Sequence, residues 1–302
     1  LYGDLQYRYI DYRVNGIDND LRDITQGYSY NFLNPKLGIS ADMTTASKLY
    51  LSLAVANREP NRSAIIDAHP ERPSPVHETL YDVESGYKFR SSKLFLDANL
   101  FYMYYRNQLV LTGKINDVGD PVMENVPKSY RAGIELSLGW KILNNLSWNT
   151  NATLSRKIIK DIVSYTDNWD EWPKQIIDTI GNTEIAFSPS AIFSSILDYE
   201  IIKDLHLALY SKYVGKQFID NTGSDERSLD PYLVNDILIS YSLFPKFMKE
   251  VAFSLKFNNI FNVKYESNAW VYRYYYDGSY STLDGYYPQA GIHIMGSITL
   301  KF

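Results

Sequence analysis

Apolar and polar residues alternate along long stretches of this chain. The apolar residues of the last segment share one parity: Ile292, Ile294, Ile298, Leu300 and Phe302. A period of two is that of a β-strand with one apolar and one polar face. The same alternation recurs in other segments: 49–55, 93–105, 131–142, 205–210 and 251–257. The pattern predicts an all-β chain.

The length of the alternating stretches distinguishes a membrane sheet from a soluble one. Strands of soluble proteins average about 5–6 residues, whereas membrane strands need about 9–11 residues and often extend beyond the bilayer. The stretches here run to roughly 12–18 residues. Several apolar faces also end in aromatic residues, as at Tyr102, Tyr104 and Trp140, which is typical of the interfacial girdle of a membrane barrel.

We predict about twelve strands, joined by connections that alternate in length. The predicted strands are 1–14, 28–41, 46–59, 79–91, 93–110, 130–142, 146–163, 184–202, 205–219, 232–243, 250–266 and 287–302. The longer connections are 15–27, 60–78, 111–129, 164–183, 220–231 and 267–286. Outer-membrane barrels have short periplasmic turns and long extracellular loops. The sequence therefore predicts a transmembrane antiparallel β-barrel whose last strand runs inward, with Phe302 at the periplasmic rim.

Composition narrows the possible functions. The 302 residues include 27 Tyr, whose amphipathic rings suit the boundary between lipid and water, and no Cys. The net charge of −5 offers no basic field for nucleic acid. No run of about 18 apolar residues predicts a transmembrane helix. No catalytic, metal-ligand or cofactor motif occurs, so neither enzymatic activity nor a cofactor is expected. The absence of a signal peptide before Leu1 suggests a mature or truncated product.

Several segments resemble the C-terminal part of TonB-dependent outer-membrane receptors. They cover about 250 residues, and the Asn-x-Phe-Asn motif with the terminal Phe is the most specific feature. The segments are Ala56–Arg62 (ANREPNR), Pro75–Glu78, Tyr81–Phe89 (YDVESGYKF), Asn99–Gly113, Asn125–Leu136, Asn258–Tyr265 (NNIFNVKY) and Pro288–Phe302. The Arg common after the Pro-x-x-Gly of the closing strand is replaced here by Ile292 or His293.

This resemblance implies a barrel of about 22 strands, plugged by an N-terminal domain and energised through TonB. Residues 1–302 would then form the C-terminal portion of the barrel domain, without the plug and the first strands. An open sheet edge in lipid leaves backbone groups unpaired at several kcal/mol each. We therefore expect a fragment or one chain of a split assembly, unless the strands close on themselves.

Three extracellular loops carry candidate ligand-binding residues. In the loop 57–78 these residues are Arg58, Arg62, His69, Arg72 and His77. Arginine binds carboxylate or phosphate, and histidine can ligate a metal. The resemblance also places His69 between segments that flank a ligand His in haem receptors, although the motifs there are poorly kept. The alternative is a solvated loop that pairs with surface sugars and divalent ions.

The second region is the most aromatic part of the chain. It is Trp270–Tyr280 in the last extracellular loop, and its candidates are Trp270, Tyr272, Arg273 and Tyr274. Trp169 and Trp172, in the separate loop 164–183, are candidates with the same two interpretations. Aromatic faces beside an arginine suit stacking on flat or anionic ligands such as metal chelates. The alternative is that these aromatic residues belong to the interfacial girdle of the barrel and pack within the loops, without binding a ligand. Polar residues expected to face the lumen, such as Asp97, Glu135, Lys256 and His293, would contact the plug or water.

The sequence thus predicts TonB-dependent import of a metal chelate across the bacterial outer membrane. The resemblance and loops of about twenty residues favour a ferric siderophore, cobalamin or haem over a large glycan. The implied partners are the TonB complex acting through the plug, the remaining barrel strands, membrane lipid and the chelate. The alternatives are a complete twelve-stranded barrel with phospholipase activity and a passive porin; the inward parity of His206 and His293 argues against the phospholipase.

Overall fold

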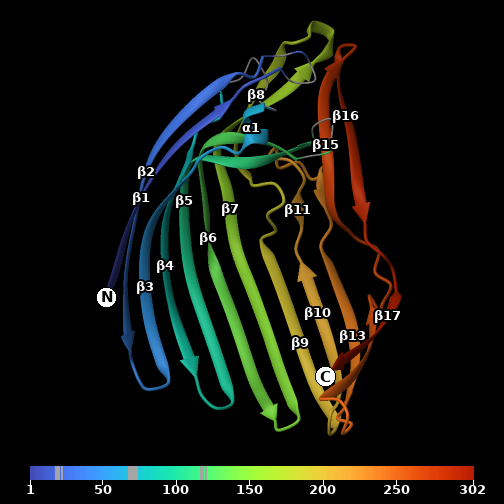
Figure 1. The fold of residues 1–302 in the computed structure, drawn as a ribbon. Helices are drawn as coiled ribbons and strands as arrows, with labels where there is room; N and C mark the ends of the chain where they lie inside the picture. The colour runs from blue at the N-terminus through green and yellow to red at the C-terminus, as the bar shows by residue number, and fades with distance from the viewer. Residues whose placement is uncertain (18–20, 22, 67–73, 116–118, 120) are drawn as a thin grey trace.

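One long antiparallel sheet dominates the structure (Figure 1). The computed structural model describes residues 1–17, 21, 23–66, 74–115, 119 and 121–302. Twelve strands form the main path of the sheet, which we call the wall, and each pairs with the next in chain order along that path. They are β1 (Tyr2–Val14), β2 (Gln26–Asp42), β3 (Ser47–Arg58), β4 (Glu78–Arg90), β5 (Leu94–Ile115), β6 (Pro121–Leu143), β7 (Leu146–Asn168), β9 (Ala191–Ile202), β10 (Leu205–Val214), β13 (Tyr232–Leu243), β14 (Glu250–Asn258) and β17 (His293–Lys301).

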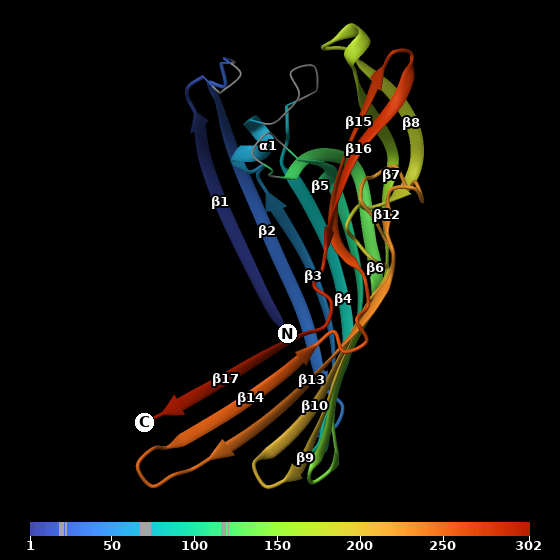
Figure 2. The ribbon, with the colours of Figure 1, turned by 90° about the vertical axis from the view of Figure 1, so that its right-hand side faces the viewer.

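The wall is an incomplete barrel. Its pairing begins at β1 and ends at β17, and no register in the described residues joins these two edge strands. Figures 1 and 2 show the strands curving into an open trough, with short turns at one rim and longer connections at the other. The predicted number of wall strands is confirmed. Short turns alternate with longer connections except between β5 and β6, because β5 continues to Ile115 and β6 begins at Pro121.

The predicted apolar parity is exposed on the outside of the wall. In β3, Leu49, Leu51 and Leu53 are 44%, 41% and 46% exposed. On the opposite parity, the hydroxyl of Tyr50 donates a hydrogen bond of 2.8 Å to Oδ1 of Asn99, and Lys88 Nζ lies 3.2 Å from Asp97 Oδ2. A row of exposed leucines beside a hydrogen-bonded polar face is stable where lipid covers the first face and water or polar groups cover the second.

Elements that cross the trough identify its concave side. The short helix α1 (Arg62–Ile66) follows β3 but contacts β6, beyond β4 and β5. Strand β15 (Glu266–Tyr276) follows β14 yet contacts β5 and β7 on the far part of the wall. Parts of a curved sheet that are distant along it can be contacted by one element only across its concave side. Helix α1 and strand β15 therefore lie on the concave side of the trough.

The predicted loops and the ends of several strands differ from the structure. Strands β5 and β6 continue into the predicted loop 111–129, and β7 continues to Asn168 and pairs with β8 (Gln175–Glu184). The predicted loop 267–286 is a hairpin of β15 and β16 (Ser279–Pro288). The predicted strand 184–202 is interrupted between β8 and β9, and two short strands, β11 (Gln217–Phe218) and β12 (Ser228–Leu229), pair with each other in the connection that follows β10.

The predicted strand 250–266 was wrong beyond Asn258. Asn259 and Asn262 both adopt positive φ, which ends the strand. The side chain of Asn259 bonds the backbone of Val263 in both directions, at 2.9 Å each, and also reaches the Ala290 carbonyl. Oδ1 of Asn262 accepts a hydrogen bond from the amide of Ile292. The Asn-x-Phe-Asn motif is therefore a turn that ties the end of β14 to the start of β17.

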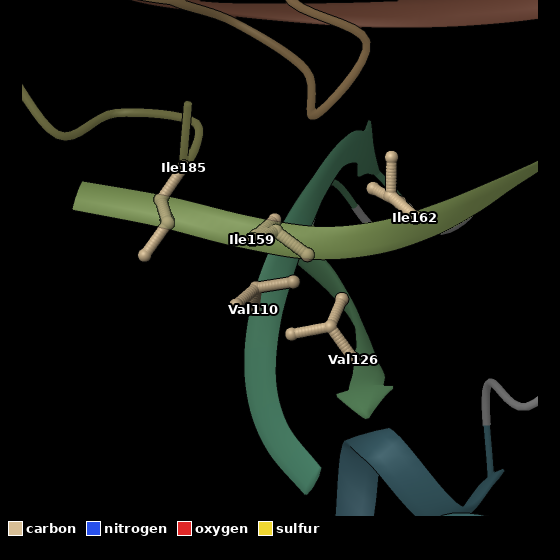
Figure 3. Close-up of a cluster of buried hydrophobic side chains, with 5 residues drawn as sticks. All are labelled: Val110, Val126, Ile159, Ile162 and Ile185. Atoms are coloured by element: carbon tan, nitrogen blue, oxygen red, sulfur yellow. The ribbon is translucent and has the colours of Figure 1, made fainter. Parts of the chain in front are cut away.

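Two buried clusters extend the fold beyond the apolar band of the wall. The first joins β5, β6, β7 and the residue after β8: Val110, Val126, Ile159, Ile162 and Ile185 (Figure 3). The second joins the connection after β10 with β15: Ile219, Leu229, Ala269 and Val271, with Phe187 against them. We call the structure built on these clusters the cap. The apolar side chains of the cap are covered by protein and not by lipid, because they are buried against one another.

Within the described ranges, no helix is both long enough and apolar enough to cross a membrane.

Candidate functional site

The hairpin β15–β16 forms one side of the candidate site. Its turn is Asp277–Gly278, and both residues have positive φ, as a two-residue type I′ hairpin requires. Strand β15 adds to the end of β7 in parallel, with Tyr274 opposite Asp167 and Tyr275 opposite Asn168. The hairpin is therefore held against the wall and is not a free loop.

Asp170 fastens the tip of this hairpin. It lies in the 3₁₀ turn η1 (Trp169–Glu171), and its two carboxylate oxygens accept hydrogen bonds from the amides of Asp277 at 2.9 Å and Gly278 at 3.1 Å. Hydrogen bonds to an ionised acceptor are roughly twice as strong as neutral ones. The connection between β7 and β8 and the last hairpin are thus joined at their outermost points.

Four rings from these two segments form an aromatic ladder: Trp169, Tyr272, Tyr274 and Tyr276. Trp169 stacks on Tyr274 with ring centroids 4.5 Å apart, and Tyr272 stacks on Tyr274 at 5.7 Å. Nε1 of Trp169 donates a hydrogen bond of 2.9 Å to the hydroxyl of Tyr272. Trp169 and Tyr276 keep about half of their surface exposed, at 47% and 56%. The ladder therefore offers ring surface to a planar ligand.

A partly buried ion pair, Lys114–Asp167, lies next to the ladder and contacts its Tyr272 ring. Nζ of Lys114 lies 3.1 Å from Oδ2 of Asp167 and 5.2 Å from the centre of the Tyr272 ring. Burial acts to raise the pKa of Asp167, but Lys114 and hydrogen bonds from Gln175 and Tyr272 outweigh it and lower the pKa. Burial, together with the charge of Asp167, raises the pKa of Tyr272 to about 12, so this ring stays neutral.

Arg273 lies in a cleft beside the ladder, between β15, β7 and the connection after β10. Its guanidinium donates a long hydrogen bond of 3.4 Å to Oγ of Ser164 and lies over the ring of Tyr280. Burial and the nearby Arg227 lower the pKa of Arg273. Arg227 itself is bonded to Asp220 at 2.8 Å. The cleft has a volume of about 50 Å³, which is space for a few atoms of a ligand and not for a whole chelate.

The other aromatic candidates occupy different positions. The indole of Trp270 packs over Gly285, where an added Cβ would lie 2.3 Å from Nε1, so it has a packing role in the hairpin. Trp172 is 62% exposed at the C-cap of η1. The structure thus brings Trp169, Tyr272 and Tyr274 together with Arg273 beside them.

The candidates of the loop 57–78 do not form one site in the described residues. Arg58 pairs with Glu78 at 3.0 Å, and the ring of His77 lies against Phe32 and Tyr30 at 5.4 Å and 6.0 Å. Arg62 is the first residue of α1. His69 and Arg72 lie outside the described residues. In the part of the chain that the structure covers, no three His, Asp or Glu side chains are grouped to hold a metal.

Several residues that build the site were not predicted. Asp170, Lys114 and Asp167 act through contacts between segments more than 50 residues apart, which no local pattern reveals. The hairpin itself had a signal, because Asp-Gly is a strong type I′ turn sequence. The segment before this turn was nevertheless not recognised as a strand, because aromatic residues occupy both parities of β15 and the alternation of apolar and polar residues is lost.

The long tilted wall, its apolar outer face, its short turns at one rim and its folded cap at the other define part of an outer-membrane β-barrel. A family model described as TonB dependent receptor-like, beta-barrel matches residues 3–263. The chain therefore belongs to the TonB-dependent receptor β-barrel family, whose barrels are outer-membrane proteins of Gram-negative bacteria. No curated protein matches the chain.

Solved structures show the same fold at low sequence identity. The siderophore receptor PiuA from Acinetobacter baumannii has a TM-score of 0.69 and 18% identity over 94% of this chain and 38% of its own. The ferric-catecholate import receptor Fiu from E. coli K12 (closed form) has a TM-score of 0.66 and 17% identity over 99% and 41%. The ferric yersiniabactin uptake receptor FyuA from Yersinia pestis has a TM-score of 0.64 and 15% identity over 93% and 39%. The chain thus spans about two fifths of their length.

Proposed function

We propose that this chain is the C-terminal part of an outer-membrane receptor that imports a metal chelate with energy supplied through TonB. The observation that carries the proposal is the cap, in which an aromatic ladder and the half-buried Arg273 lie together on a barrel wall of this family. The structurally similar receptors include siderophore receptors and a copper transporter, which favours a chelated metal as the cargo.

In this proposal the ladder stacks on flat parts of the chelate and Arg273 binds an acidic group. The ligand class is a ferric siderophore, cobalamin or haem. Arg58, Arg62, His69, Arg72, His77, Trp172 and Trp270 remain candidate contacts on the same rim. The plug, which the same or a second chain would supply with the remaining strands, closes the lumen and connects the receptor to TonB. We expect no cofactor and no contact with nucleic acid.

Transport of labelled iron tests the proposal. A strain that lacks its own siderophore receptors and expresses the complete gene is offered a panel of chelates of radioactive iron, including haem. We expect energy-dependent uptake of one chelate, and we expect Trp169→Ala with Tyr274→Ala to reduce uptake about tenfold, because stacking contributes roughly 1 kcal/mol or more for each ring pair. Cobalamin uptake is measured in parallel.

Phe247→Ala provides the matched control for this experiment. Phe247 is an aromatic residue that is more exposed than Trp169, at 80%, but it lies in the short turn between β13 and β14 at the opposite rim. We expect its substitution to leave uptake within twofold of the original. Uptake that continues without TonB, or that is equally sensitive to both substitutions, would contradict the proposal.

The phospholipase alternative has no support in the described residues. Nδ1 of His206 lies 2.9 Å from Oδ1 of Asp198 on the inner face, away from lipid. Ser240 is opposite His206 in the pairing of β10 with β13, but no hydrogen bond joins its hydroxyl to the imidazole. A passive pore would show itself as a stable conductance of the purified protein in planar bilayers, and we expect none while the plug is in place.

A further inference from the structure

Three cationic side chains form a row on the outer face of the wall, across the neighbouring strands β5, β6 and β7 (Figure 1). Arg106 is directly opposite Lys128, and Lys128 is directly opposite Lys160. Residues opposite each other in an antiparallel sheet project from the same face, with Cβ atoms about 4.5–5.5 Å apart. Their parity is that of Leu100 and Leu154 on the apolar outer face. We call these three exposed residues the cationic row.

The cationic row lies at the cap end of the apolar band. On β5 this band runs from Leu94, opposite Trp140, to Tyr104, opposite Tyr130. About ten residues of a strand extend roughly 34 Å, or about 25 Å across a membrane when the strand is tilted by about 40°, which is the height of the lipid-facing band of such barrels. Arg106 is the next outward position after Tyr104, so the row lies at the level of the lipid head groups.

The cationic row has no anionic partner among the described residues. Its side chains make neither an ion pair nor a hydrogen bond with any of them. The guanidinium of Arg106 lies over the ring of Tyr81, and Nζ of Lys160 lies over the ring of Tyr130. Like charges directly opposite one another destabilise a sheet. An anion bound from outside the chain would remove this repulsion.

A fourth cation extends the positive surface towards the lipid. Arg156 is exposed, has the outward parity of β7 and lies opposite Ala132, four residues before Lys160. A charged side chain within the apolar band extends its head group to the nearest interface. The guanidinium of Arg156 is therefore expected to approach the cationic row from below.

The cationic row also marks the boundary between the wall and the cap. Asn107 and Asp161 directly follow Arg106 and Lys160, and both have positive φ. Beyond this point β5 enters the first buried cluster at Val110. The carboxylate of Asp161 forms no ion pair with a described residue. An anion bound to the row would thus lie where the strands leave the wall.

We propose that the cationic row binds the phosphate groups of a phosphorylated glycolipid in the outer leaflet of the outer membrane, and that this lipid stabilises the junction between wall and cap. Arg106 can contact a phosphate through two N–H groups, and the two lysines act as point charges. Three charges across two strand spacings, about 10 Å, match a head group with more than one phosphate. The acyl chains lie along the apolar band below the row, a contact that free phosphate lacks. The inference goes beyond the import proposal and does not depend on it.

Lipid binding to the complete protein in detergent tests the proposal. Native mass spectrometry compares bisphosphorylated lipid A with lipid A from which both phosphates have been removed. We expect the phosphorylated form to bind about tenfold more tightly or better. The triple variant Arg106→Gln, Lys128→Gln and Lys160→Gln should lose this preference, because its side chains no longer carry charge.

A second triple variant is the matched control. Arg13→Gln, Lys203→Gln and Lys246→Gln remove the same number of exposed positive charges at other places, and Arg13 is already paired with Asp11 at 3.3 Å. We expect the control to bind phosphorylated lipid A within twofold of the original protein. Equal loss in both triple variants, or equal binding of the two lipids, shows that the inference is wrong. Complete displacement of the lipid by an equal concentration of inorganic pyrophosphate would indicate a site for free anions and would also overturn it.

Lys128→Glu separates the loss of binding from damage to the fold. A glutamate between Arg106 and Lys160 supplies an anion within the sheet, and opposite charges in this position stabilise it. In lipid-free detergent we expect hydrogen exchange at 158–163 to slow by about twofold or more, while the affinity for phosphorylated lipid A falls about tenfold. Faster exchange, or unchanged affinity, contradicts the proposal. Neither measurement needs cargo or TonB, so a failure of the import proposal would leave both results unaffected.

Discussion

Asp167 connects the wall, the ladder and the last hairpin through a single carboxylate. It pairs with Lys114, accepts a hydrogen bond from Gln175 and lies opposite Tyr274 of β15. A carboxylate that is largely buried must keep its partners, because an uncompensated charge in such a position costs several kcal/mol. Neighbouring Thr166 is completely buried, so the end of β7 has little room to adjust.

The lowered pKa of Asp167 predicts that acid releases the hairpin. Because the folded-state pKa lies below the ordinary value of 3.8, the ionised carboxylate stabilises the cap above that pH, and the contribution is lost as the pH falls through the lowered pKa. We expect the emission of Trp169, isolated by difference against Trp169→Phe, to shift to longer wavelength below about pH 4. The measurement is made in detergent micelles.

Two variants check the cause of this transition. Asp167→Asn removes the titrating group and should abolish the shift while the barrel stays folded. Lys114→Met leaves the carboxylate without its cation and should move the transition to higher pH. A shift that persists in Asp167→Asn would show that another group is responsible.

At the scale of elements, the cap depends on close contact between three segments at Gly113. This glycine has φ of +86°, and an added Cβ would lie 2.3 Å from the carbonyl oxygen of Ile219 and 2.9 Å from Cγ1 of Val271. Only glycine allows β5, the connection after β10 and β15 to approach so closely. The second buried cluster forms directly around this contact.

We predict that Gly113→Ala separates these segments, whereas Gly119→Ala does not. Gly119 has almost the same φ, +87°, but no atom of the described residues lies within 4 Å of its added Cβ. Both substitutions strain the backbone by about 1–2 kcal/mol, but only the first also creates a collision. Hydrogen exchange at 217–229 and 266–276 should accelerate by about tenfold or more in Gly113→Ala alone. Equal acceleration in both variants would attribute the effect to backbone strain.

The sequence predicted the wall better than it predicted the cap. A strand in a membrane barrel alternates because lipid lies on one side, so its pattern can be read locally, as in Leu49–Val55. In the hairpin, Tyr272 and Tyr274 share one parity and Val271 and Tyr275 the other, so both faces carry apolar or aromatic residues and no polar face marks the strand. Contacts such as Asp170 with Gly278 join distant segments and leave no periodic signal.

At the scale of the whole molecule, the two rims of the wall should lie on opposite sides of the outer membrane. The hairpin turn and the cap belong to one rim, and the short turn between β4 and β5 belongs to the other (Figure 1). The chain lacks Cys, so single introduced thiols report on each rim separately.

We predict that a bulky, membrane-impermeant maleimide labels Ser279→Cys on intact cells. Ser92→Cys, in the short turn, should react only after the outer membrane is permeabilised. Both positions are exposed, so a difference in labelling reports on the side of the membrane and not on burial. Labelling of Ser92→Cys on intact cells would reverse the orientation and place the ladder on the wrong side for capture from outside.

If the proposed import function holds, the contact at Gly113 also bears on how the protein can change its ligand during evolution. The surface around Arg273 is shared between β5, β6, β7, the connection after β10 and the final hairpin, so no single loop would carry the whole ligand specificity. Recombination that exchanges one of these segments with a distant relative would leave mismatched halves of the second buried cluster. Chimeras should therefore remain functional when all five segments are inherited together, and new specificity should arise more readily by point substitution on the ladder.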